Sequence, residues 1–515
     1  MPMLTRRAFL SAAGSAALAA PAILRAQSGG FTAFPFSLGV AAGDPSPDGF
    51  VIWTRLAPDP LEAHGGMAMA PVAVTWELAT DEAMRTIVRK GEEKARAELA
   101  HSVHVELAGL EPDRPYWYRF RSGGQKSVIG RARTLPAAGS SPRALRFGVA
   151  GCQHYEDGFY TAFRHLADED LAFVFHYGDY IYEGWAKGIE TAHSGEIVTP
   201  VRRHVGQTCF DLADYRRRYA QYKADPDLQR AHALQTWFAT FDDHEVRDNW
   251  AGDHDPTDTP PELFRTRRAA AFQAWYEHMP VRRSLFPRGA AIDAYRNARY
   301  GDLVSFDFLD TRQYRSGYQC GDDFAPPCAK LDDPSATMIS AGEEAWLVRN
   351  LTRPQARWSC VAQQVMMMAL DRRTDPGPSP ILNMDSWAGY EAPRRRLLSR
   401  MRGLDNVVVL TGDEHQNFAG LLVDRDRPVA VEFVASSISS GGDGSDKRRG
   451  SDVILRNNPE LKFINDQRGY HVCEVTPDAW RSDVMVLDRV STPGAPIRRR
   501  ATLTVPHGRP DLAVA

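Results

Sequence analysis

The 515-residue chain has few cysteines, little net charge and no long apolar run beyond its N-terminus. Six cysteines are too few for a scaffold held together by disulfides. A formal net charge of -3 argues against nucleic acid as the main partner. No apolar stretch after the N-terminus reaches the length of a membrane span. The remaining composition, 43% hydrophobic and 25% charged, is typical of a soluble protein with two or more domains and a large core.

The N-terminus has the pattern of a targeting segment. Arg6 and Arg7 precede an alanine-rich, weakly apolar run over residues 11–24. This pattern is typical of a twin-arginine (Tat) signal, with cleavage after Ala26. The alternative is an N-terminal helix with two exposed arginines. We therefore expect residues 1–26 to be read by the Tat export machinery, which places the mature protein in the periplasm or outside the cell.

Residues 36–136 have the pattern of an all-β region. Short alternating runs recur with turn signals between them, at residues 50–53, 72–76, 101–105 and 116–120. Strands at this spacing predict a small β-sandwich of the Fn/Ig-like kind. The Leu110-Glu111-Pro112 turn ahead of Tyr116 resembles the corner of a fibronectin-type module.

The composition also predicts the limits of the main domain. Residues 137–142 (AAGSSP) have the composition of a linker, so the main domain should span residues 143–500. We expect the end of the chain, residues 501–515, to be a loosely ordered tail. The serine- and glycine-rich segment 436–450 is expected to be mobile.

The stretch from Arg146 to Tyr182 predicts a strand, a helix and a second strand. Apolar runs at 145–150 and 171–175 flank a helical spacing of aromatic and aliphatic residues. Continuous apolar strands indicate a mostly parallel sheet that is covered on both faces, and chemistry in such sheets lies at the carboxyl ends of the strands. Cys152 and Asp179 follow the two strands, and Tyr182 lies just beyond.

Two further apolar runs end in metal-type residues. The run at 233–241 is followed by Asp242, Asp243 and His244, and the run at 405–410 is followed by Asp413 and His415. Taken singly, each cluster has an ordinary alternative, such as a buried thiol, a turn aspartate or a core tyrosine. Four clusters at four strand ends together supply oxygen, nitrogen and sulfur ligands for two metal ions.

The motifs resemble those of a known enzyme family. GDYIY, FDDHEV and TGDEH are similar to the GDxxY, GNH and GHxH blocks of binuclear metallophosphoesterases. The segments at 36–58, 149–153 (VAGCQ), 267–280 and 308–316 resemble the alkaline phosphatase D family more closely. That family includes phospholipase D-like phosphodiesterases. The resemblance covers nearly the whole mature chain and implies an α/β fold, in which a calcineurin-like αββα sandwich follows the Fn/Ig-like domain.

The resemblance also implies two metal sites. Cys152, Asp179, Tyr182 and His415 would hold Fe(III), and Asp179 would bridge to a Ca(II) site shared with Asp243 and Asp413. Hard oxygen ligands suit calcium. Asp243 takes its place only if DDHE is superimposed on GNHE. Its alternatives are Asp242, Asp248 and Asn249.

The implied reaction is metal-assisted hydrolysis of phosphate monoesters or diesters, in which a metal lowers the pKa of a water molecule. His244 would orient the phosphate or protonate the leaving group, or would instead brace a ligand carboxylate. Arg312 and, second, Arg247 are candidates for a guanidinium clamp on the phosphate, and ordinary salt bridges are their alternative.

Several alternatives stay open at this point. Within the enzyme class, a phospholipase D-like activity on phospholipids competes with hydrolysis of small phosphate esters. Outside it, the chain could be a secreted binding protein whose calcium site is structural. Loops 183–222 and 310–340 are expected to shape the site, and Cys320 and Cys328 could form a disulfide in an exported protein.

Overall fold

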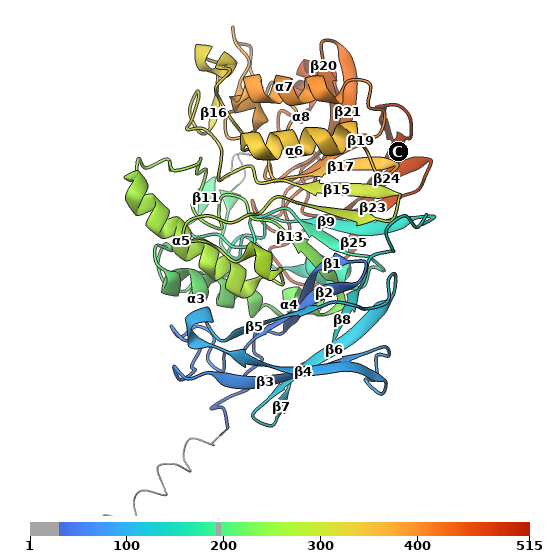
Figure 1. Cartoon of the computed structure of the whole chain (residues 1–515). Helices are drawn as coiled ribbons and strands as arrows, with labels where there is room; N and C mark the ends of the chain where they lie inside the picture. The colour runs from blue at the N-terminus through green and yellow to red at the C-terminus, as the bar shows by residue number, and fades with distance from the viewer. Residues whose placement is uncertain (1–29, 192–196) are drawn as a thin grey trace, which may run out of the picture.

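The structure is a computed structural model that describes residues 30–191 and 197–515 (Figure 1). The expected export signal, residues 1–26, lies outside the described residues. Within the described ranges, no helix is both long enough and apolar enough to cross a membrane.

The N-terminal region is a β-sandwich, as the alternating runs predict. Its outer sheet has the order β4-β3-β6-β7, with β8 paired to β6. The strands are β3 (Val72–Ala79), β4 (Ile87–Ala95), β6 (Pro115–Ser122), β7 (Gln125–Lys126) and β8 (Gly130–Arg133). This sheet packs against β1 (Val40–Ser46), β2 (Gly49–Arg55) and β5 (Ser102–Leu107) through buried side chains such as Ile52, Val74 and Tyr118. The Glu111 backbone N–H donates to the Tyr116 hydroxyl at 2.9 Å, which makes the expected corner.

The inner layer of this sandwich continues into the main domain. Strand β1 pairs in parallel with β13 (Thr236–Ala239), so β1, β2 and β5 form one edge of a ten-stranded sheet. The order of that sheet is β26-β25-β24-β23-β9-β10-β13-β1-β2-β5. The sandwich therefore shares a sheet with the domain that follows it, a long-range pairing that local patterns do not reveal.

The first sheet carries four neighbouring parallel strands, β1 and the three strands of the main domain, which are β9 (Leu145–Ala150), β10 (Val174–His176) and β13. Because they are parallel neighbours, their carboxyl ends meet at one edge of the sheet. On the far side, β9 pairs antiparallel with β23 (Gly469–Val475), which leads to β24 (Ala479–Leu487).

The second sheet has the order β14-β15-β17-β19-β21-β20-β22. Its strands are β14 (Arg296–Tyr300), β15 (Val304–Phe308), β17 (Trp358–Ala362), β19 (Val407–Thr411), β20 (Asn417–Asp424), β21 (Arg427–Val434) and β22 (Leu461–Asn465). It packs face to face on the first sheet through aromatic contacts. The ring of Phe306 lies 5.2 Å from that of Phe147 and 5.3 Å from that of Phe173.

Helices cover the outer face of each sheet (Figure 1). The first sheet is covered by α2 (Thr161–Ala167), α3 (Leu212–Lys223), α4 (Pro226–Leu234) and α5 (Pro261–His278). The second is covered by α6 (Ala341–Thr352), α7 (Glu391–Met401) and α8 (Ser451–Asn457). Asp225 caps α4, accepting from the backbone of Asp227 at 2.9 Å, with Pro226 as the first helical residue. The layers run helix, sheet, sheet, helix.

The end of the chain differs from the expected loose tail. Strand β25 (Ile497–Pro506) pairs along its length with β24, and β26 (Ala513–Val514) pairs back onto β25. Ala501, Leu503 and Val505 alternate into the core between the sheets, which explains the order. The three arginines at 498–500 mask this alternation in the sequence.

The cysteines divide as expected. Cys320 and Cys328 form a disulfide that brackets the short strand β16 (Phe324–Ala325), and β16 pairs with β18 (Leu382–Asn383). The remaining four cysteines are free and buried. A two-stranded hairpin, β11 (Glu190–Thr191) and β12 (Ile197–Val198), lies in the long connection between β10 and α3.

Candidate metal centre

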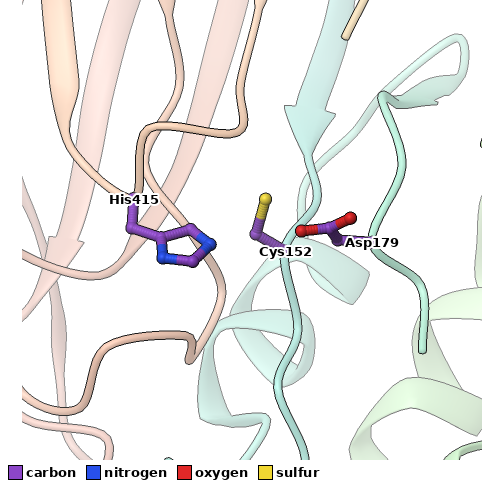
Figure 2. Close-up of side chains that lie close together, drawn as sticks. All are labelled: Cys152, Asp179 and His415. Carbon is purple, nitrogen blue, oxygen red and sulfur yellow. The ribbon is translucent and has the colours of Figure 1, made fainter. Parts of the chain in front are cut away.

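The strand ends of the two sheets converge on one buried group of ligand atoms. Cys152 and Asp179 follow β9 and β10 of the first sheet, and His415 follows β19 of the second. One ligand atom from each lies within 4.8 Å of the other two. Figure 2 shows the Cys152 thiol between the Asp179 carboxylate and the His415 ring. The Tyr182 hydroxyl completes the group, because it lies 2.7 Å from Asp179 Oδ2 and 3.0 Å from His415 Nε2.

Two further groups of potential ligands adjoin the first, one through the shared Asp179 and the other through the shared Asp243. Asp179, Asp243 and His244 form one, and Asp242, Asp243 and Asp413 form the other, each with ligand atoms within 4.8 Å. Asp179 thus belongs to two groups, which is the arrangement that a bridging carboxylate needs. The structure brings all six predicted metal ligands together.

The backbone at these positions is unusual. Cys152, Asp179, Asp413 and His415 have φ angles of 50°, 55°, 68° and 51°, in the left-handed region that non-glycine residues rarely adopt. Such conformations persist where the surroundings hold them, and they cluster at functional sites. Here the Glu245 carboxylate accepts backbone N–H groups of Asp179 at 3.1 Å, Tyr180 at 2.6 Å and Asp242 at 2.8 Å. The sequence offered no signal for this role of Glu245.

The described residues balance the charges of the centre only in part: Arg312 Nη2 lies 3.7 Å from Asp243 Oδ1, and His244 Nε2 lies 3.9 Å from Asp243 Oδ2. Asp179 Oδ1 and Asp243 Oδ1 are buried and have no hydrogen-bond partner in the part of the chain that the structure describes. Burial and the Asp243 carboxylate raise the pKa of Asp179 well above its usual value, and burial and Asp242 do the same to Asp413. Burial, with Asp179 beside it, also raises the pKa of the Cys152 thiol. Buried unpaired carboxylates are unfavourable unless a cation compensates them.

The donor atoms fit two different cations. The group of thiol, imidazole, phenol and carboxylate suits a transition-metal ion, whereas the group made only of aspartates suits a hard cation such as calcium.

His244 is oriented by a carboxylate. Its Nδ1 lies 2.8 Å from Glu183 Oε2, and its Nε2 lies 3.9 Å from Asp243 Oδ2. Burial alone lowers the pKa of His244, but the carboxylates of Asp243, Asp179 and Glu183 outweigh it and raise the pKa well above the usual value. The ring also contacts Tyr182, with centroids 4.0 Å apart. Both predicted roles of His244 are compatible with this position.

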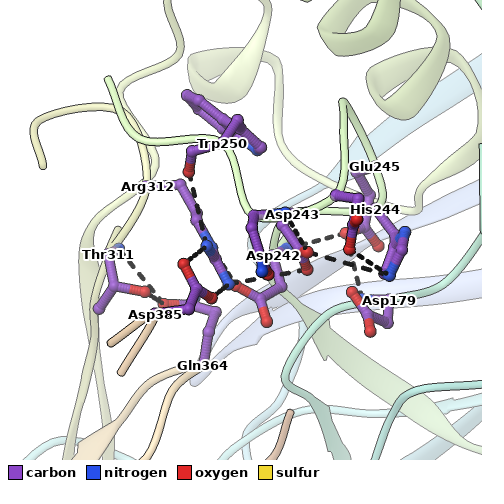
Figure 3. Close-up of polar contacts among 12 residues, drawn as sticks. Asp179, Asp242, Asp243, His244, Glu245, Trp250, Thr311, Arg312, Gln364 and Asp385 are labelled. Atoms are coloured by element: carbon purple, nitrogen blue, oxygen red, sulfur yellow. Dashed lines mark hydrogen bonds and ion pairs between the residues drawn. The ribbon is translucent and has the colours of Figure 1, made fainter. Parts of the chain in front are cut away.

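Arg312 lies differently from the predicted phosphate clamp. It is fully buried, with Nε 2.6 Å from Asp242 Oδ1 and Nη2 2.8 Å from Asp385 Oδ2 (Figure 3). It is not among the residues that line the cavity above the centre. The geometry supports the salt-bridge alternative, in which Arg312 positions Asp242 and Asp385. Arg247 does line the cavity, with Nη1 3.1 Å from Glu183 Oε1.

The alternatives to Asp243 as a ligand lie nearby. Asp242 faces Arg312 with one oxygen and leaves the other without a partner among the described residues. The Asp248 side chain is 50% exposed, and Asn249 donates its backbone N–H to Asp243 Oδ2 at 2.8 Å. Asp243 is buried and belongs to two of the ligand groups, so its position fits a ligand best.

A cavity of about 480 Å³ opens above the centre. The two predicted loops both contribute to it, through Glu183 to Thr191 of the long connection and through Asp322 to Phe324 beside the disulfide. The segment 436–450 also reaches the centre. The buried Ser440 hydroxyl lies 2.7 Å from the Tyr182 hydroxyl and 2.8 Å from the Cys152 carbonyl oxygen. Its serine- and glycine-rich composition had suggested only a mobile loop.

Comparisons with known proteins agree with this architecture. Residues 147–484 match the model of the PhoD-like phosphatases, and residues 22–136 match that of their N-terminal domain. Alkaline phosphatase D of Bacillus subtilis (strain 168) is 45% identical over 513 residues, which cover 96% of this chain and 87% of that protein. The solved structure of PhoD has a TM-score of 0.91 and 45% identity, covering 95% of this chain and 93% of that one.

These findings define the class of protein first: it is an enzyme, a phosphoric ester hydrolase with a mixed α/β fold behind an N-terminal β domain. The chain belongs to the PhoD-like phosphatase family. The resemblance found in the sequence motifs is thereby confirmed.

Proposed function

We propose that this chain is an exported, metal-dependent phosphoesterase that hydrolyses phosphate monoesters, diesters or both at the centre formed by the strand ends. The observation that carries the proposal is the convergence of a thiol, an imidazole and unpaired buried carboxylates from two sheets under one cavity. The helix–sheet–sheet–helix layering supports the calcineurin-like assignment of the core.

The donor atoms of the ligand residues divide them between two cations. Cys152, Asp179, Tyr182 and His415 would hold Fe(III), and Asp243 and Asp413 would hold Ca(II), with Asp179 between the two. When bound, the cations would lower the pKa of water and stabilise negative charge on the phosphate oxygens.

The chain's own residues would position and protonate the substrate. Glu183 fixes Nδ1 of His244, which leaves Nε2 on the cavity side to donate a proton to the leaving-group oxygen. Arg247 lines the same cavity and can donate hydrogen bonds to a phosphate oxygen. Arg312 would act indirectly, because it does not line the cavity but holds Asp242 and Asp385 in place.

A phospholipid substrate is a second candidate. Trp185, Ile189 and Ile197 are 65%, 72% and 74% exposed, and Trp185 lines the cavity. Exposed apolar side chains beside a cavity can contact an acyl chain. Turnover of phosphatidylcholine vesicles, with free choline as the measured product, separates this activity from hydrolysis of soluble esters.

Export by the Tat route to the periplasm or the medium is part of the proposal. Its support is the twin-arginine segment together with the Cys320–Cys328 disulfide, since disulfides persist in oxidising compartments.

The test combines metal analysis with turnover. Elemental analysis of the purified protein should find iron and calcium, and a tyrosine ligand on Fe(III) should give visible colour. Hydrolysis of p-nitrophenyl phosphate and bis-p-nitrophenyl phosphate should be lost on chelation and restored by the two metals. A colourless, iron-free protein with full activity would contradict the iron assignment. A fully metallated protein inert to both esters would contradict the proposed activity on simple esters.

A further inference from the structure

The cavity above the metal centre is lined by both acidic and basic side chains. Asp322 and Asp323 lie on the side of the disulfide loop. Three arginines that we call the basic wall also line the cavity: Arg372, Arg448 and Arg468. Arg372 reaches the disulfide loop, because its guanidinium carbon lies 5.4 Å from the centroid of the Phe324 ring. The basic wall adjoins the centre directly, because the Arg468 guanidinium donates to the backbone carbonyl of His415.

Two members of the basic wall already have acidic partners. Arg372 Nη2 lies 2.8 Å from Glu414 Oε2, and Arg468 Nη2 lies 3.1 Å from Asp466 Oδ1. The other cations of the cavity are paired as well, since Lys187 Nζ lies 3.4 Å from Asp157 and Arg247 Nη1 lies 3.1 Å from Glu183.

Arg448 is the exception. No carboxylate in residues 30–191 and 197–515 lies within ion-pair distance of its guanidinium, and it makes no side-chain hydrogen bond there. The side chain is partly buried, and burial together with the nearby Arg372 lowers its pKa to about 10. It therefore stays charged near neutral pH. A half-buried cation without an ion-pair partner loses hydration that no direct contact in the described part of the chain replaces.

The backbone that carries Arg448 is held in place. The Asp446 carboxylate pairs with Arg500 and accepts from Asn465 Nδ2 at 3.1 Å. The Ser451 N–H donates to the Arg448 carbonyl at 3.1 Å, at the start of α8. Arg448 is thus presented to the cavity from an anchored loop, which reduces the entropy lost on binding a ligand.

We propose that Arg448, with Arg372 and Arg468 beside it, binds a second anionic group of the substrate, a carboxylate or a further phosphate, while the centre binds the phosphate that is hydrolysed. This inference rests on the proposed function and names its substrate class: organic phosphates with two anionic groups. The carboxylates of Asp322 and Asp323, which also line the cavity, would repel the same group, so the position of Arg448 also sets the substrate's orientation.

The test compares matched substrates that differ in the second anion. Glycerol 3-phosphate is paired with 3-phosphoglycerate, glucose 6-phosphate with 6-phosphogluconate, and fructose 6-phosphate with fructose 1,6-bisphosphate. The wild-type enzyme should favour the more anionic member of at least one pair. The carboxylate and bisphosphate pairs distinguish the two kinds of anion. The different lengths of the substrates report how far Arg448 lies from the phosphate that is hydrolysed.

The variant Arg448→Gln should lower kcat/KM for the preferred substrate by about tenfold, mainly through KM. The kcat/KM for the matched substrate without the second anion should fall clearly less. Arg448→Lys should recover part of the preference. Arg449→Gln is the control, because Arg449 is the exposed neighbour and its loss changes net charge equally. Equal losses for both members of every pair, or no wild-type preference, would overturn the inference. Turnover by the wild type of the substrates that carry only one phosphate and no second anion tests the proposed function separately.

Discussion

Two regions of this molecule bury many charged side chains, and they treat them in opposite ways. One is the metal centre. The other is the seam between strands β1 and β2 at the edge of the first sheet and the helices α3 and α5 that pack against them. In the seam, Arg216 Nε lies 2.7 Å from Glu277 Oε2, and Arg55 Nη1 lies 2.7 Å from His278 Nε2. In the centre, Asp179 keeps a buried oxygen that has no hydrogen-bond partner among the described residues, and Asp243 keeps one whose nearest cation, Arg312 Nη2, is 3.7 Å away.

The difference separates charges that hold the fold together from charges arranged for a ligand. A paired buried charge fixes the packing of its neighbours, and its loss exposes the partner. An unpaired carboxylate on a left-handed backbone has no such structural use, so a missing cation is its simplest explanation. Substitutions in the seam should therefore change stability, and substitutions in the centre should change activity.

The largest effect should follow from removing the thiol of the centre. Cys152→Ala should lower kcat on p-nitrophenyl phosphate by about a thousandfold and reduce bound iron, because the group loses its only sulfur donor. Cys360→Ala is the matched control, since it removes another buried thiol, from β17 between the sheets. It should cost stability and keep its iron. Similar iron contents in Cys152→Ala and Cys360→Ala would contradict the assignment of Cys152 as a metal ligand.

The seam should respond in stability alone. Glu277→Ala leaves the Arg216 guanidinium without its buried partner, which should cost about 3–5 kcal/mol in the free energy of unfolding. Urea unfolding measures the cost, and kcat of the folded fraction should stay unchanged. The exposed Arg288–Asp293 pair supplies the control, because Asp293→Ala should cost less than about 1 kcal/mol. A loss of bound metal in Glu277→Ala would contradict the separation of the two regions.

His244 should show an intermediate effect. His244→Gln removes the group held by Glu183 at 2.8 Å, and kcat should fall by about a hundredfold while the metal content stays. The loss should be smaller for a substrate whose leaving group needs no proton, such as p-nitrophenol, than for an alkyl phosphate. Equal losses for both leaving groups would support the alternative in which His244 only braces a ligand.

The sequence predicted the parts of the centre that follow strands. Each of Cys152, Asp179, Asp243 and Asp413 lies two to four residues after a strand, so periodicity locates the region, and the motif resemblance selects the residue. The sequence did not reveal Glu245, whose carboxylate holds three backbone N–H groups, because no local pattern distinguishes an anchoring glutamate from a ligand.

Long-range pairing was also out of reach of the sequence. The β1–β13 ladder joins residues almost 200 positions apart, and Arg312 meets Asp385 through folding alone. The sequence predicted Arg312 as a possible phosphate clamp because it follows a strand. In the fold its side chain is buried and paired with Asp242. The residue types at the strand ends could be predicted from the sequence. The distant partner that decides whether a side chain binds a ligand or forms a salt bridge could not.

The smallest effect tests Lys223 of α3, a cation of the seam that lies over aromatic rings. Lys223 Nζ lies 4.3 Å from the Trp53 ring centroid, and burial lowers its pKa to about 7. Because the unfolded chain has the higher lysine pKa, it binds more protons between about pH 7 and pH 10, and stability should rise with pH across that window. Lys223→Met should therefore raise stability by roughly 1–2 kcal/mol below pH 7, less than the full shift because the ring contacts of the cation are lost. The gain should shrink towards pH 10, and the exposed Lys90→Met should show none of this dependence. A pH-independent gain in urea unfolding would mean that Lys223 is charged and solvated, and that the seam tolerates an unpaired charge as the metal centre does.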